Sequence, residues 1–294
     1  IHYANIDSRQ VSDHDKAMED LVLGKPSLAR LLRQTPIAYI WDDHDFTGND
    51  ADGSAPGRLA ARLSYQRLVP HYPLVFGSGD VPIDQAFTAG RVRFILSDLR
   101  SEKVKGGAPW SEAQKNWFKG QVLNARDRHL MIAWVSSYSF SGNEKDNWGG
   151  HELERTALCD WLMENKIANL MILSGDAHMI AMDNGSNSDF STGKKSPFRY
   201  PIFQAAGLAN RGSDKGGIYS EGGTFPNPEI PRTDLKTADG KAWYYTASSY
   251  GQFGMVRVVD MGGEFIEIKF EGFRVDGNSG ETSKLVEYSF KRKL

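Results

Sequence analysis

Short apolar runs alternate with segments of helical periodicity along the first part of the chain. The runs are rich in β-branched and aromatic residues, which predicts buried strands at residues 37–41, 92–96, 129–135 and 168–174, with a further strand just before the turn at Ala89-Gly90. Amphipathic or capped segments predict helices at residues 27–34, 57–69, 111–126 and 151–166. Strands without polar alternation, separated by helices, are typical of an α/β core whose sheet is covered on both faces.

The pattern changes toward the carboxyl terminus. Residues 186–240 are rich in Gly, Ser, Pro and Lys, which predicts long loops around one short strand at residues 200–206. A meander of further strands is then predicted at residues 243–249, 254–260, 264–270 and 284–290. Because no linker interrupts the pattern, residues 1–294 are expected to form a single domain.

Composition and charge narrow the classes of function. The net charge is -2 and there is no long basic run, which disfavours a nucleic-acid partner. No apolar segment reaches the roughly 20 residues of a membrane-spanning helix. The single cysteine, Cys159, excludes an intrachain disulfide and is expected to be a buried structural thiol.

Polar residues with metal-ligand chemistry follow three of the predicted strands. They are Asp42, Asp43, His44 and Asp45 after the first strand, Asp98 and Arg100 after the second, and Asp176 and His178 after the fourth. Ligands of open α/β sheets bind at the carboxyl ends of the strands, so these residues are expected to converge on one crevice. Carboxylates with imidazole suit Zn, Fe or Mn, and paired cations can activate water against a phosphoryl group. The residues alone therefore predict a metal-dependent hydrolase.

Simpler interpretations of the same residues stay open at this point. Asp and His after a strand often cap the next helix, and the acidic loop at residues 42–45 could be a solvated turn. Arg100 could pair with Asp98 or Glu102. Ser136 has no G-x-S-x-G sequence around it, so a serine hydrolase is disfavoured.

Four motifs in order resemble one known family. W-D-D-H-D, S-D-L-R, D-N-W-x-G and L-S-G-D-A-H are together similar to the PhoD-like (alkaline phosphatase D) branch of the calcineurin-like metallophosphoesterases, over the chain as far as about Gly254. The resemblance implies a four-layer α/β/β/α sandwich. It also implies hydrolysis of phosphate mono- or diesters by a hydroxide that bridges two metals, acting on a small phosphate-ester substrate. Export to the periplasm or beyond is common among such relatives.

The resemblance also implies roles for individual residues. Asp43 and Asp176 are expected to bind the second metal, and His178 the first. His44 is expected to contact the phosphate and to protonate the leaving group. If Gly-Asp precedes the I-H-Y that opens this chain, Tyr3 is the tyrosinate ligand of ferric iron. The bridging Asp of the family and the strand before it are then expected to lie upstream of this sequence.

One departure from the family pattern concerns the second metal. Ser136 and Ser137 stand where the wider superfamily has a histidine ligand. An oxygen-rich site of this kind favours Ca²⁺ beside Fe³⁺, with Zn²⁺ or Mn²⁺ as alternatives. Arg100 is expected to bind a non-bridging phosphate oxygen, and Asn49 is a further candidate for the substrate side.

Two other functions remain as alternatives. A metallophosphoesterase fold with an incomplete site would be a non-catalytic binding module. A phospholipid-directed phosphodiesterase is also found in this branch, but the sequence has no amphipathic membrane-binding helix that would favour it. The sequence does not indicate the oligomeric state.

Overall fold

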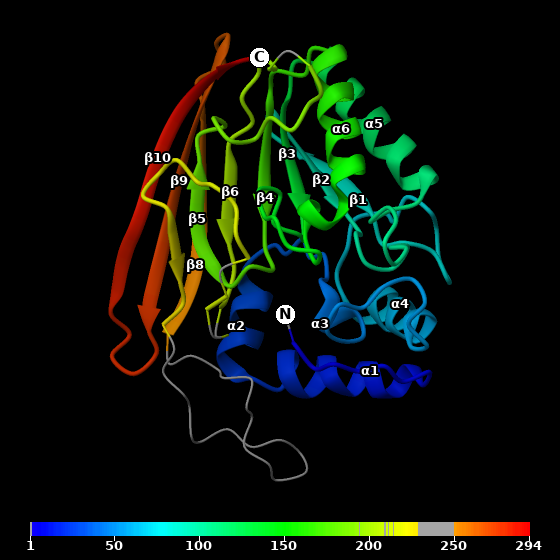
Figure 1. Ribbon diagram of the computed structural model, residues 1–294. Coiled ribbons are helices and arrows are strands. Elements are labelled where there is room, and N and C mark those ends of the chain that lie inside the picture. Colours follow the sequence, from blue (N-terminus) through cyan, green and yellow to red (C-terminus); the bar gives the residue numbers. More distant parts are fainter. Residues whose placement is uncertain (1, 194, 209, 211, 214, 229–249) are drawn as a thin grey trace. The chain divides into compact units, whose positions relative to one another are not determined.

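The computed structural model describes residues 2–193, 195–208, 210, 212–213, 215–228 and 250–294 (Figure 1). The chain forms two compact units, and each is described by itself. The first unit consists of residues 1–88 and 94–121, and the second of residues 89–93 and 122–294. Whether the two act as one domain stays a prediction.

The first unit contains the predicted helices of the amino-terminal part. Its helices are α1 (Val11–Met18), the π-helical turn η1 (Glu19–Leu23), α2 (Pro26–Gln34), the one-turn α3 (Asp43–Phe46) and α4 (Arg58–Leu68). The predictions of helices at residues 27–34 and 57–69 are thus confirmed. Helix α1 was not predicted.

An aromatic core in the first unit anchors the start of the acidic loop. The ring of Trp41 lies 5.1 Å from that of Phe46 and packs edge-on against Tyr65 at 5.2 Å. Met18 and Val22 belong to the same buried cluster. Apolar packing of this kind fixes the backbone directly before Asp42.

The prediction of a strand at residues 37–41 is wrong. The segment is irregular and pairs with no strand among the described residues. Its carbonyl at Tyr39 instead accepts hydrogen bonds from the Tyr65 hydroxyl at 2.5 Å and the Gln85 Nε2 amide at 3.2 Å. Side chains satisfy a backbone group here that a sheet partner would otherwise satisfy.

Strands β1 (Gln85–Ala89) and β2 (Val92–Ser97) form where two strands were predicted. Gly90, with φ of 56°, makes the turn between them. Helix α5 (Glu112–Asp127) begins with the capping box that its sequence predicts. Ser111 Oγ accepts from the Gln114 amide at 3.3 Å, and Gln114 Oε1 accepts from the Ser111 amide at 2.9 Å.

One mixed sheet of seven strands has the order β1-β2-β3-β4-β6-β5-β7. The strands of the second unit are β3 (Met131–Ser136), β4 (Leu170–Ser174), β5 (Met179–Asp183), β6 (Ile202–Ala205) and β7 (Thr224–Pro226). Strands β3, β4 and β6 are parallel, whereas β5 runs antiparallel to β6 and β7. The predicted strands of this part are confirmed, and β5 and β7 were not predicted.

A second, antiparallel sheet has the order β10-β9-β8 and contains β8 (Tyr250–Asp260), β9 (Phe265–Asp276) and β10 (Thr282–Lys293). These strands confirm the predicted meander; the strand predicted at residues 243–249 lies outside the described residues. The two sheets pack closely, since the rings of Phe203 and Phe270 stack at 4.6 Å. A Cβ at Gly272 would overlap the Cγ2 of Ile180, so only glycine fits there.

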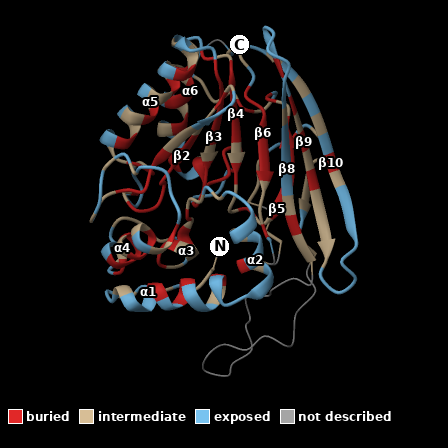
Figure 2. Ribbon diagram, turned by 180° about the vertical axis from the view of Figure 1, so that it is seen from behind, coloured by how far each residue is buried: buried red, intermediate tan, exposed pale blue. Residues whose placement is uncertain are grey.

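The second unit is therefore layered. Helix α6 (Glu152–Glu164), as predicted, covers one face of the larger sheet, and the smaller sheet covers the other (Figure 1). Figure 2 shows mostly intermediate and exposed residues along β10. The described residues of this unit supply three of the four expected layers, and the prediction of an α/β fold is confirmed. No described helix is long and apolar enough to cross a membrane.

The buried Cys159 gives a testable pH dependence. Its Sγ lies 3.9 Å from the Ser188 carbonyl, and burial raises the pKa of the thiol to about 12. In the unfolded chain the thiol has its ordinary pKa, near 9. The stability linked to the raised pKa of the folded state is therefore fully present below pH 9 and is lost as the pH rises toward 12. We expect the thiol to be unreactive with a thiol reagent until the protein unfolds.

Unfolding curves against pH separate this effect from general alkaline instability. Above pH 9, wild-type stability should fall more steeply than that of Cys159→Ala, by up to about 1.4 kcal/mol per pH unit. Parallel curves for wild type and Cys159→Ala would show that the thiol does not contribute to the pH dependence of stability.

Candidate metal centre

The amino-terminal segment of the first unit is bound to the acidic loop. The amides of His2 and Tyr3 donate to Asp45 Oδ1 at 2.9 and 3.0 Å. The Asn5 amide donates to the His44 carbonyl at 3.2 Å, and Asn5 Oδ1 lies 2.5 Å from His44 Nδ1. The ring of Tyr3 stacks on that of His44 with centroids 3.8 Å apart. Two residues predicted for the site, Tyr3 and His44, therefore lie in contact.

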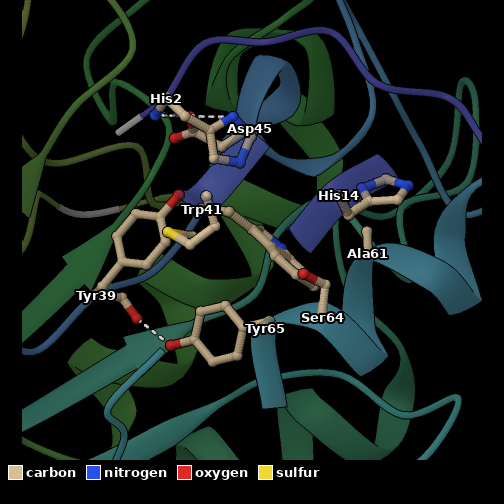
Figure 3. A pocket seen from close by; sticks show the side chains of 9 residues that line it. His2, His14, Tyr39, Trp41, Asp45, Ala61, Ser64 and Tyr65 are labelled. Atoms are coloured by element: carbon tan, nitrogen blue, oxygen red, sulfur yellow. Dashed lines mark hydrogen bonds and ion pairs between the residues drawn. The ribbon is translucent and has the colours of Figure 1, made fainter. Parts of the chain in front are cut away.

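Asp45 faces the interior of the first unit. Figure 3 shows it beside His2, at the edge of a small cavity that Tyr39, Trp41 and Tyr65 also line. The cavity has a volume of about 20 Å³, enough for one water molecule. Burial, more than the nearby charge of Asp45, raises the pKa of Tyr39, and burial lowers that of His2 to about 4. We interpret Asp45 as an anchor for the amino-terminal segment.

Asp43 is the buried centre of the acidic loop. Its Oδ1 accepts from the His44 amide at 2.7 Å and its Oδ2 from the Asp50 amide at 2.8 Å. Carboxylate oxygens of Asp42 and of Asp50 each lie within 4.8 Å of one of Asp43. Asn49 is exposed in the same turn. Acidic residues therefore cluster within this unit, around a carboxylate whose position the backbone fixes.

Arg100 pairs with a different partner from those considered in the sequence. Its side chain is fully buried, and its Nε donates to Asp42 Oδ1 at 2.5 Å. Glu102 pairs with Arg62 instead. Arg100 therefore orients one carboxylate of the acidic loop, and a contact with phosphate stays a prediction.

In the second unit, the loop after β4 has an unusual backbone. Asp176 and His178 adopt positive φ angles of 68° and 47°. Non-glycine residues in this region are uncommon and occur where surrounding contacts impose them. The His178 carbonyl accepts from the Asn227 amide at 3.3 Å, and a Cβ at Gly207 would lie 3.2 Å from His178 Cα. Tight packing thus orients His178.

A charged group in the second unit consists of Asp146, Asp176 and Lys215. The Lys215 ammonium lies 3.0 Å from Asp176 Oδ1 and 3.3 Å from Asp146 Oδ2. Sequence reasoning assigned a role to neither Asp146 nor Lys215. The signal for Asp146 was its place in the D-N-W-x-G motif, whereas Lys215 lies in a Gly-rich stretch without a pattern.

Aromatic packing positions the loop that carries Asp146. Tyr138 and Trp148 are fully buried, so both pack in the core. Trp148 Nε1 donates to Ser136 Oγ at 3.0 Å, and Ser136 Oγ donates to the Tyr138 carbonyl at 2.9 Å. Ser136 therefore holds the loop, which agrees with the view that it is not a nucleophile.

The donor groups suit hard metal ions. The first unit offers carboxylates with the phenol of Tyr3, and the second offers carboxylates with the imidazole of His178. Carboxylate oxygens favour Ca²⁺ or Mn²⁺, and the imidazole and phenol extend the range to iron and zinc. Asp146 and Asp176 already hold the Lys215 ammonium between them.

The fold and these charged loops define a mixed α/β protein with two packed sheets. No protein-family model matches the chain, and no curated protein matches it. A solved structure of PhoD is similar, with a TM-score of 0.64 and 15% sequence identity, over 99% of this chain and 61% of that one. At this identity the similarity shows the fold. It confirms the PhoD-like resemblance at the level of fold and extends it beyond Gly254.

Proposed function

We propose that the chain is a metal-dependent phosphoesterase that hydrolyses phosphate mono- or diesters. The observation that carries the proposal is the contact of Tyr3 with the ordered loop that carries Asp43 and His44, because the family resemblance assigns all three to the site. The similarity to PhoD supports it through the fold. Export, which is common among relatives, is proposed on the resemblance alone.

The proposed ligands are those that the family resemblance assigns. Asp43 and Asp176 hold the second metal, and Tyr3 and His178 the first, with Fe³⁺ and Ca²⁺ the favoured pair. When bound, paired cations polarise the phosphate and activate water. Arg100 keeps Asp42 in place beside Asp43, which limits movement of the acidic loop.

His44 is the proposed general acid. Because Asn5 Oδ1 can only accept, its contact with His44 Nδ1 places a hydrogen on that nitrogen. Nε2, which lies 4.0 Å from Asp43 Oδ2, is therefore the nitrogen that can take up and release a proton. His44 would donate this proton to the departing ester oxygen. Asn49, exposed in the same loop, is proposed to contact the substrate.

A non-catalytic binding module is the second candidate. The contact that favours it is the Lys215 ammonium between Asp146 and Asp176, since a site without metal would need such a counter-charge. The two candidates differ in their response to metal ions.

Chelation tests the proposed function. The protein from its full reading frame would be stripped of metal and assayed with an aryl phosphomonoester and a bis-aryl phosphodiester. We expect no turnover by stripped protein and recovery with Fe³⁺ and Ca²⁺, or with Mn²⁺ or Zn²⁺. Turnover that chelation does not affect would contradict a metal mechanism, and the absence of turnover with every metal would favour the binding module.

A further inference from the structure

Lys215 is fixed in the second unit through its backbone. Its carbonyl accepts from the Asn143 amide at 3.4 Å and from Asn147 Nδ2 at 3.3 Å. The lysine therefore docks onto the loop that also carries Asp146. Its backbone position does not depend on its side chain.

Two glycines after Lys215 make this docking close. Gly216 and Gly217 have φ of 71° and 99°, a region that residues with a Cβ rarely adopt. A Cβ at Gly217 would lie 2.6 Å from the Ser141 carbonyl oxygen, which is too close for any other residue. The loop thus follows the surface of residues 141–147 and presents Lys215 to the carboxylates.

The ammonium lies in a poorly solvated position. The side chains of Asp146, Asp176 and Lys215 are 9%, 5% and 17% exposed. Two carboxylates at such burial repel each other and lose hydration unless a positive charge lies between them. Lys215 supplies that charge.

A divalent cation could take the place of this positive charge. Ca²⁺ binds carboxylate oxygens at about 2.3–2.6 Å, a little closer than the 3.0 and 3.3 Å of the ammonium contacts. Small side-chain movements would therefore exchange one for the other. The lysine stem is flexible, so the ammonium can leave while the docked backbone stays.

We propose that Lys215 is an internal counter-ion that competes with the second metal for Asp146 and Asp176. The proposal rests on the proposed function, because it takes Asp176 as a metal ligand, and it adds Asp146 as its partner. Lys215 offsets part of the pair's negative charge before metal loading and weakens metal affinity at this position. It is a positioning residue for the carboxylates and sets the metal concentration at which the site fills.

Calcium titration calorimetry on stripped wild-type protein and Lys215→Met tests this directly. Methionine keeps the length of the stem and removes the charge. We expect Lys215→Met to bind Ca²⁺ about tenfold more tightly, equal to about 1.4 kcal/mol. Thermal unfolding should agree: metal-free Lys215→Met unfolds below wild type, and Ca²⁺ raises its midpoint by more than it raises that of wild type.

A matched control is Lys291→Met. Lys291 is 69% exposed on β10 and contacts Glu267 at 3.5 Å, so the change removes one lysine and one ion pair from the surface. Its Ca²⁺ affinity should equal that of wild type.

The outcomes distinguish this proposal from the proposed function. Equal Ca²⁺ affinity in wild type and Lys215→Met would overturn the competition and leave the phosphoesterase standing. Equal metal affinity with weaker inhibition by inorganic phosphate would assign Lys215 to the substrate and likewise overturn it. If neither protein binds Ca²⁺, Fe³⁺, Mn²⁺ or Zn²⁺, both proposals are wrong.

Discussion

Asp176→Asn is expected to lower kcat by about a thousandfold, with loss of the second metal, because several kcal/mol of transition-state stabilisation depend on that cation. Asparagine is the informative substitution at this position. Asp176 has a φ of 68°, and asparagine adopts this region more readily than alanine does. The variant should therefore keep the loop conformation and lose only the charge.

Asp160→Asn is the matched control for this prediction. Asp160 lies in the same unit and accepts hydrogen bonds from Thr192 at 2.7 and 2.8 Å, outside the charged group. Its kcat and metal content should equal those of wild type. If Asp176→Asn keeps both values while Asp160→Asn behaves as expected, Asp176 is not a metal ligand.

Asp98→Ala is expected to destabilise the first unit by about 3–5 kcal/mol. Asp98 is fully buried and accepts from Trp41 Nε1 at 2.8 Å, from the Ile83 amide at 3.1 Å and from the Arg100 amide at 3.1 Å. Ser101 also donates to it, through both its amide and its hydroxyl. Removing the carboxylate leaves several buried donors without an acceptor. Denaturant unfolding of wild type and of Asp98→Ala measures the loss of stability.

Asp20→Ala provides the comparison for a surface carboxylate in the same unit. Asp20 is 55% exposed and pairs with Lys16 at 2.6 Å. Exposed pairs contribute little, so stability should change by less than about 1 kcal/mol. Similar losses for the two variants would mean that the Asp98 network does not support the fold. Because Trp41 directly precedes the acidic loop, we also expect Asp98→Ala to reduce activity.

Most helices and strands could be predicted from the sequence, since their apolar periodicity is local. The segment at residues 37–41 could not. Its composition is that of a strand, but Tyr65 and Gln85 satisfy the Tyr39 carbonyl from distant positions. Composition indicates burial, whereas a strand also requires a partner strand, which the local sequence does not identify.

The candidate site was predicted in the same uneven way. Asp43 and His44 follow an apolar run and belong to a motif, so local sequence was sufficient to single them out, and their roles stay predictions. Arg100 was recognised, but its partner Asp42 was not, because the pairing joins two separate loops. Lys215 has no pattern around it, and its importance comes only from its contacts with Asp146 and Asp176.

The most direct test of the phosphoesterase proposal is the metal content of the freshly purified full-length protein by elemental analysis, with ester hydrolysis assayed on the same sample. The account predicts about two bound metals per chain and activity that rises in proportion to occupancy. Folded protein that hydrolyses phosphate esters equally well with no bound metal would contradict it.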